Sequence, residues 1–192
     1  MNLLIGAVAF LLGSIPSAYL YAKLFGKHDI RQIGSGNVGA MNTARETGLL
    51  PGVLTLLTDF LKASAAVYLA AKFGDASYMP LLAAALVIGG HNYNPFLSFK
   101  GGKGLACLGG ALVMIEPVIL IYLLIPIVIF TLILKDTNTA TGLSMLALPF
   151  LLYYITKPDT FYLLIGSFIA LAILTKHFVD FNAYRKGRRR LF

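Results

Sequence analysis

Long apolar stretches separated by short polar segments run through almost the whole of this 192-residue chain. Hydrophobic residues make up 58% of it and charged residues 12%, whereas an ordinary soluble domain carries about 25% charged residues. A helix needs about 20 apolar residues to cross the hydrocarbon core of a bilayer. The pattern therefore predicts an all-α integral membrane protein.

The apolar stretches predict seven transmembrane helices in one transmembrane domain over residues 1–192, because we find no internal repeat and no second domain. The expected spans are 2–22, 49–71, 78–99, 104–116, 117–134, 139–156 and 160–176. Residues 104–134 fit either one overlong helix or two short ones, and Glu116-Pro117 favours a break since proline cannot donate the helix hydrogen bond. The first stretch lacks the basic start of a secretory signal peptide, so we expect it to be retained.

The basic residues predict the orientation of these spans. With seven spans and the N-terminus outside, one face collects 13 of the 16 lysines and arginines. Six spans would move Lys135, Lys176 and the C-terminal basic run to the other face, against the excess of positive charge on cytoplasmic loops. We therefore expect a cytoplasmic C-terminus, and we interpret the net charge of +8 as a topology signal rather than as a nucleic-acid surface.

Two glycine-rich stretches stand out on the predicted cytoplasmic face. Glycine lets backbone N–H groups approach an anion closely, and a neighbouring cation adds charge, so both stretches are candidate phosphate sites. The first supplies a hydroxyl, amides and a guanidinium: Gly34, Ser35, Gly36, Asn37, Asn42 and Arg45. Its G-x-G-x-x-G spacing lacks the strand and helix context of a dinucleotide site, which we exclude. A plain connecting loop is the alternative.

The second stretch comprises Gly101, Gly102, Lys103 and Gly104. It lacks the spacer of a nucleotide-binding P-loop. It leads directly into an apolar run, and if a helix starts there, the positive end of its dipole points to the same place as Lys103. Lys100 and Lys103 as simple membrane anchors are the alternative.

Other polar residues fit structural roles as well as chemical ones. Asp59 and Lys62 lie three residues apart in the second span, where an ion pair is the first interpretation. His91 fits helix capping or packing as well as chemistry, and His177 ends the last span as a proton carrier or hydrogen-bond donor. Cys107 reads as a small buried hydrophobe. The three histidines are too dispersed for a metal site, and no cofactor is expected.

The ordered motifs resemble those of bacterial membrane acyl-phosphate:glycerol-3-phosphate acyltransferases of the PlsY type. The matching residues are Leu12-Gly13-Ser14-Ile15-Pro16, Asp29-Ile30-Arg31, the 34–40 stretch with Asn42 and Arg45, Asp59 and Lys62, Gly90-His91, and Pro95-Phe96 with 99–104 and Ala106. The resemblance implies a seven-helix enzyme that acylates the 1-hydroxyl of sn-glycerol 3-phosphate, giving lysophosphatidic acid and phosphate, without a metal or an acyl thioester.

The resemblance also implies site residues. Ser35, Arg45, Lys103 and His177 are expected to be catalytic. The residues expected to bind substrate are Gly34, Gly36, Asn37, Asn42, His91, Gly101, Gly102, Gly104 and Thr141. A third family motif begins at His177 and matches again at Gly187, but Asp180, Ala183 and Arg189 replace the usual asparagine, arginine and glutamate. Acyl-phosphate, glycerol 3-phosphate and membrane lipid are thus the expected partners, without nucleic acid.

Two rival functions follow from the same residues. A transporter for a phosphorylated anion would place polar groups along a whole transmembrane path, whereas here only Asp59 and Lys62 lie deep in the predicted membrane. A non-enzymatic scaffold would explain the altered third motif. For the enzyme, we expect catalysis by positioning and charge stabilisation without an acyl-enzyme, with the hydroxyl proton passing to His177 or to a substrate phosphate.

Overall fold

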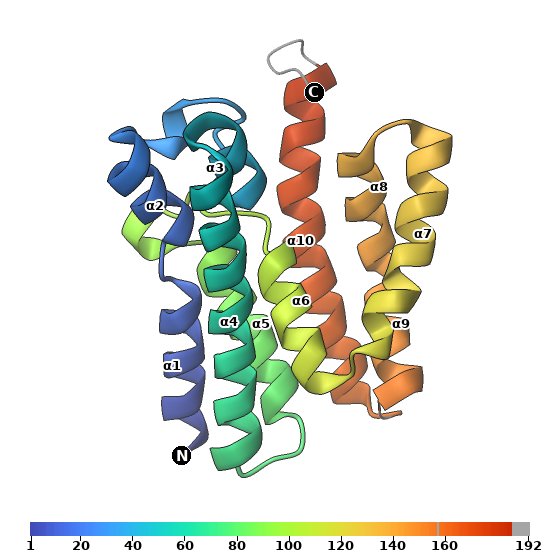
Figure 1. The fold of residues 1–192 in the computed structure, drawn as a ribbon. Helices are drawn as coiled ribbons and strands as arrows, with labels where there is room; N and C mark the ends of the chain where they lie inside the picture. The colour runs from blue at the N-terminus through green and yellow to red at the C-terminus, as the bar shows by residue number, and fades with distance from the viewer. Residues whose placement is uncertain (157, 186–192) are drawn as a thin grey trace. The chain divides into compact units, whose positions relative to one another are not determined.

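The computed structural model describes residues 1–156 and 158–185 of the chain, and side chains as far as Phe178 apart from residue 157. These described residues form helices and connecting loops and contain no strand (Figure 1). The predicted all-α class is confirmed. The chain folds as two compact units, Met1–Met114 and Ile115–Phe192. That both belong to one functional domain stays a prediction.

The first unit contains the two glycine-rich stretches. Its helices are α1 (Asn2–Gly13), α2 (Ser17–Gly26), α3 (Ala40–Thr47), α4 (Leu49–Phe73), α5 (Met79–Asn92) and α6 (Leu105–Ile115), which ends at the unit boundary. Short 3₁₀ turns lie at Ile30–Gln32 and Pro95–Leu97. The N-terminus and the α4–α5 connection lie at one end of this unit, and α2 and α3 lie at the other (Figure 1).

The second unit carries the remaining helices. They are α7 (Val118–Leu134), α8 (Thr137–Ser144), α9 (Leu148–Leu151) and α10 (Thr160–Arg185), with a 3₁₀ turn at Met145–Ala147 and a π-helical turn at Leu152–Thr156. The Asp136 carboxylate caps α8 by accepting hydrogen bonds from the backbone N–H groups of Asn138 and Thr139, each at 3.0 Å. This cap satisfies donors that the first turn of a helix leaves without intrahelical partners.

Helices occupy each of the seven expected ranges, with differences in detail, and the sixth range is divided into α8, a 3₁₀ turn, α9 and a π-helical turn. The first is broken at Ser14-Ile15-Pro16, the third ends at Asn92 instead of residue 99, and the last continues to Arg185. The expected break at Glu116-Pro117 is present. Four stretches of the described residues are long and apolar enough to cross a membrane: Asn2–Gly26, Leu49–Phe73, Thr137–Thr156 and Thr160–Phe178. The count of seven crossings and the outside N-terminus therefore stay predictions.

The break between α1 and α2 follows from Pro16, which has no N–H to donate to the preceding turn. The last carbonyls of a helix that ends here have no intrahelical donor, and they need other partners where water is scarce. The Ser14 carbonyl accepts a hydrogen bond from Asn94 Nδ2 at 2.8 Å, and the Ile15 carbonyl accepts one from Lys62 Nζ at 2.9 Å. The break thus ties α1 to α4 and to the end of α5.

Candidate functional site

The buried side-chain amide of Asn42, on α3, holds the conformation of the first glycine-rich stretch through hydrogen bonds. Asn42 Nδ2 lies within hydrogen-bonding distance of the carbonyl oxygens of Ile30, Ile33 and Asn37, at 3.3, 3.2 and 3.1 Å. Its Oδ1 accepts the backbone N–H of Ser35 at 3.0 Å. In this structure the Asn42 side chain binds backbone groups of the loop. A contact between Asn42 and a substrate stays a prediction.

Gly34 makes this close approach possible. It has a φ of +55°, in the left-handed region that side chains rarely adopt. A Cβ at this position would also lie 2.5 Å from Glu46 Oε1 and collide with Asn42 Oδ1. Only glycine therefore lets the loop fold over the start of α3, which begins immediately after Gly39.

Three polar side chains that we expect to contact substrate at this stretch are accessible to solvent. Ser35 and Asn37 are partly exposed, and Arg45 is exposed in the last turn of α3. Ser35 Oγ accepts the backbone N–H of Asn37 at 3.3 Å, and no histidine or carboxylate hydrogen bond to this hydroxyl occurs in the described part of the chain. The Ser35 hydroxyl therefore lacks the adjacent base that an activated serine nucleophile needs.

The second glycine-rich stretch leads into a helix, as expected: α6 begins at Leu105, directly after Gly104. Lys103 is partly exposed, whereas Gly102 and Gly104 are buried. Both stretches thus end at a helix N-terminus, α3 for the first and α6 for the second. Unpaired N–H groups and the helix dipole favour anions at such positions.

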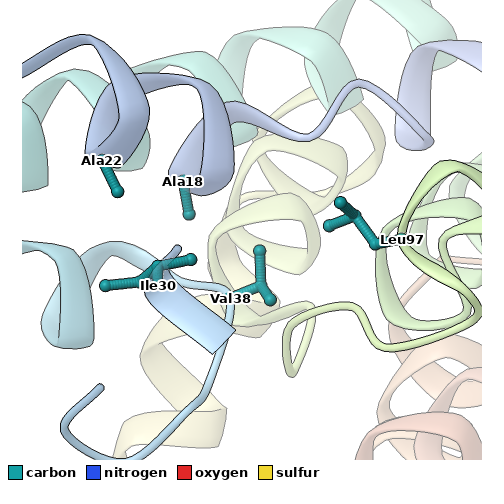
Figure 2. Close-up of a cluster of buried hydrophobic side chains, with 5 residues drawn as sticks. All are labelled: Ala18, Ala22, Ile30, Val38 and Leu97. Atoms are coloured by element: carbon teal, nitrogen blue, oxygen red, sulfur yellow. The ribbon is translucent and has the colours of Figure 1, made fainter. Parts of the chain in front are cut away.

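The two stretches, separated by more than 60 residues of sequence, abut in the folded chain. A Cβ on Gly102 would lie 2.5 Å from the backbone carbonyl oxygen of Val38. Beneath this contact is a buried apolar cluster contributed by α2, the two 3₁₀ turns and the first stretch: Ala18, Ala22, Ile30, Val38 and Leu97 (Figure 2). Burial of this cluster packs the first stretch against the 3₁₀ turn that precedes the second.

An ion pair adds a second connection between these segments. Arg31 Nη2 lies 2.7 Å from Asp29 Oδ2, and Arg31 Nη1 donates to the Leu97 carbonyl at 3.5 Å. The hydrogen bond from Arg31 lowers the pKa of Asp29 below its ordinary value, so the carboxylate stays ionised at neutral pH. The turn before the first stretch is thereby attached to the turn before the second.

A buried polar cluster lies directly under the second stretch. Asp59 and Lys62 form the expected ion pair, with Lys62 Nζ 2.7 Å from Asp59 Oδ1, and His91 Nδ1 lies 3.1 Å from the same Nζ. His91 is thus a buried member of this cluster rather than a helix cap; its predicted contact with a substrate stays a prediction. The cluster joins α4 to α5.

Cys107 is buried as expected, and its sulfur also lies next to this cluster. Its Sγ, an Asp59 oxygen and a His91 ring nitrogen lie within 4.8 Å of one another, a donor set that suits a metal ion. The Lys62 ammonium, however, lies 2.7 Å from Asp59 Oδ1 and 3.1 Å from His91 Nδ1. Because the ammonium already neutralises the carboxylate and contacts the same acceptors, these residues fit a charge pair better than a metal.

His177 and Thr141 belong to the second unit. His177 is buried on α10, and its Nδ1 lies 3.0 Å from the Ile173 carbonyl, which can only accept a hydrogen bond. In the neutral ring the proton is therefore on Nδ1, and Nε2 is the basic nitrogen. α8 packs against this histidine, since a Cβ on Gly142 would lie 2.9 Å from His177 Cβ. Thr141 Oγ1 donates to the Thr137 carbonyl at 2.7 Å.

The rest of the third motif is not placed by the structure. Asp180 and Ala183 lie in α10 beyond the last described side chain, and Gly187 and Arg189 lie outside the described residues.

Comparisons with known proteins agree with this architecture. The family model described as glycerol-3-phosphate acyltransferase matches residues 3–187. Glycerol-3-phosphate acyltransferase 2 of Moorella thermoacetica is 38% identical over 176 residues, covering 90% of this chain and 88% of its own. Glycerol-3-phosphate acyltransferase 1 of Dehalococcoides mccartyi is 39% identical over 187 residues, covering 94% and 88%.

Solved structures are similar over the same length. A crystal structure of PlsY, an integral membrane glycerol 3-phosphate acyltransferase, in its glycerol 3-phosphate form has a TM-score of 0.84 at 31% identity, covering 100% of this chain and 95% of that one. Its lysophosphatidic acid form has a TM-score of 0.80 at 30% identity, covering 98% and 94%.

Fold and comparisons together define the class: a helical integral membrane protein with several apolar helices. Within that class, the chain belongs to the glycerol-3-phosphate acyltransferase family of the PlsY type, since the family model spans nearly its whole length. The resemblance inferred from the sequence motifs is confirmed.

Proposed function

We propose that this chain transfers a fatty acyl group from acyl-phosphate to the 1-hydroxyl of sn-glycerol 3-phosphate. The products are 1-acyl-glycerol 3-phosphate and inorganic phosphate, in the first acylation step of phospholipid synthesis. One observation carries the proposal: the two glycine-rich stretches, each ending at a helix N-terminus, abut at Gly102 and Val38. Such a pair of adjacent anion sites suits a reaction between two phosphate compounds.

The proposed roles of the residues are those expected from the sequence. Ser35 and the N–H groups of the first stretch bind the acyl-phosphate, while Arg45, Lys103 and His177 bind glycerol 3-phosphate. The substrate hydroxyl oxygen attacks the acyl carbon, and the bond from that carbon to the phosphate oxygen breaks. Phosphate is a good leaving group, so positioning and positive charge supply the main catalytic effect.

The hydroxyl proton has two candidate acceptors, His177 and a substrate phosphate. The Nδ1 contact with the Ile173 carbonyl supports His177, because it leaves Nε2 as the basic nitrogen of the neutral ring. The same proposal includes seven membrane crossings and an active site that faces the cytoplasm across a bacterial inner membrane. The excess of basic residues on one predicted face supports this orientation.

The donor is tested with purified protein in detergent. We expect lysophosphatidic acid and one equivalent of phosphate from acyl-phosphate and glycerol 3-phosphate, and no product when acyl-CoA replaces acyl-phosphate. Product formed equally from acyl-CoA would refute the proposed donor.

The direct transfer step is tested at Ser35. We expect Ser35→Ala to lower kcat/KM for acyl-phosphate about 10- to 100-fold, since a charge-assisted hydrogen bond contributes about 1.5–3 kcal/mol. Rapid quenching of the wild type followed by mass spectrometry should find no acylated peptide. Ser167→Ala serves as the control, because Ser167 is exposed and bonds only its own helix. An acyl group trapped on Ser35 during turnover would contradict direct transfer.

A further inference from the structure

Three helices, α2, α4 and α5, contribute side chains to the buried polar cluster next to the second glycine-rich stretch. Asp59 and Lys62 on α4 are 1% and 5% exposed, and His91 on α5 is 7% exposed. Ser17, the first residue of α2, donates its hydroxyl to Asp59 Oδ1 at 2.7 Å. These four residues, Ser17, Asp59, Lys62 and His91, are named the buried network below.

Lys62 is the centre of this network, because an ammonium has three N–H donors and three acceptors surround it. They are Asp59 Oδ1 at 2.7 Å, the Ile15 carbonyl at 2.9 Å and His91 Nδ1 at 3.1 Å. The Ile15 carbonyl lies in the break between α1 and α2, where it also accepts the Ser17 N–H at 3.0 Å. A buried charge pair is a weak source of net stability, but removal of one partner is costly because it leaves the other charge buried and unpaired.

His91 connects the buried network to the Gly101–Gly104 loop. Its backbone carbonyl accepts the N–H of Gly102 at 3.2 Å. A Cβ on Gly101 would collide with the same carbonyl, and a Cβ on Gly102 would collide with His91 Nε2. The ring therefore has one edge against Lys62 and the other against the backbone of the glycine-rich stretch.

We propose that the buried network is a positioning device that sets the conformation of the Gly101–Gly104 loop for binding the phosphate of glycerol 3-phosphate, with His91 as the positioning residue. The proposal rests on the proposed function for the identity of the ligand. It differs from the substrate-binding role predicted from the sequence, because His91 acts through the Gly102 backbone rather than by touching the substrate.

The test compares His91→Ala with His91→Asn and with Ser64→Ala. Asparagine restores an oxygen near the position of Nδ1 as an acceptor for Lys62. Ser64 is the matched control, since it lies on α4 two residues beyond Lys62 and bonds the Gly110 carbonyl at 2.9 Å, away from the loop. Two quantities are measured: the KM values for both substrates, and hydrogen–deuterium exchange of the backbone amides of residues 98–105.

We expect His91→Ala to accelerate exchange in 98–105 and to raise the KM for glycerol 3-phosphate about tenfold, with the KM for acyl-phosphate changed less than about twofold. A small displacement of a binding loop has effects on the order of 10- to 100-fold. His91→Asn should recover most of both losses, and Ser64→Ala should leave both unchanged.

Three results would overturn the proposal: loop exchange in His91→Ala equal to the wild type, equal changes in both KM values, or no recovery in His91→Asn. Should His91→Ala yield too little folded protein, Ser17→Ala removes a single hydrogen bond from Asp59 and should change the same two quantities about threefold in the same direction. The exchange measurement needs no turnover. A wild-type protein without transferase activity would therefore refute the proposed function, while loop exchange would still decide on the network.

Discussion

Lys103→Met is expected to raise the KM for glycerol 3-phosphate about 10- to 100-fold while the protein stays folded. In the proposed site this ammonium makes a charge-assisted contact with the phosphate of glycerol 3-phosphate, and such contacts contribute about 1.5–3 kcal/mol. Methionine keeps the length of the side chain and removes the charge. Steady-state kinetics with glycerol 3-phosphate varied at saturating acyl-phosphate give the KM.

Lys100→Met is the matched control for this prediction. Lys100 is exposed, three residues earlier, and precedes the glycines that approach the N-terminus of α6. We expect its KM for glycerol 3-phosphate to stay within about threefold of the wild type, in keeping with a weak effect of an exposed charge. Similar losses in both variants would mean that general positive charge, rather than the Lys103 position, attracts the substrate.

Asn42→Leu is expected to have the largest effect on both stability and activity. The substitution removes one acceptor and the amide donors shared among three carbonyls. The Ile33 carbonyl still accepts the Gly36 N–H at 2.9 Å, but other partly buried backbone groups at and before the first stretch lose the partner that Asn42 supplies. Each such group costs about 1–3 kcal/mol. We expect a clear fall in the melting temperature and a loss of kcat/KM of about 100-fold or more, because the loop that carries Ser35 loses its shape.

Asn42→Asp separates the two halves of this prediction. The carboxylate keeps an acceptor for the Ser35 N–H but cannot donate to the Ile30, Ile33 and Asn37 carbonyls. An intermediate melting temperature and intermediate activity are expected. Wild-type kinetics in a folded Asn42→Leu protein would show that the first stretch keeps its conformation without this amide.

Local patterns in the sequence predict much of the fold. The seven helical ranges, the break at Glu116-Pro117 and the helix after Gly104 follow from apolar length, from proline and from glycine, each of which acts over a few residues. The ion pair of Asp59 and Lys62 follows from helix periodicity, because residues three apart share a face. These features depend on neighbours in sequence, so one chain suffices to infer them.

The contacts that join distant segments follow from packing and are not visible in local patterns. Nothing near Lys62 in sequence indicates that it bonds the Ile15 carbonyl, although the Ser14-Ile15-Pro16 break shows that some donor is needed there. Likewise, the sequence does not distinguish Asn42 from the other polar residues near the first glycine-rich stretch. In the structure its side-chain amide holds that loop through hydrogen bonds to the backbone. The early end of α5 at Asn92 has a local signal in Pro95, since helices usually end before the residue that precedes a proline. The hydrogen bond from the Asn94 amide to the Ser14 carbonyl, in contrast, has none.

The central claim is that the two abutting glycine-rich stretches bind the two phosphates of one acyl transfer. The most direct test uses sealed proteoliposomes that contain the purified protein. Labelled glycerol 3-phosphate is added with and without acyl-phosphate, and the fate of the label is followed. We expect label to enter lysophosphatidic acid only when acyl-phosphate is present, in proportion to the phosphate released. Label that collects in the vesicle lumen without acylation, or folded protein that forms no lipid product, would contradict it.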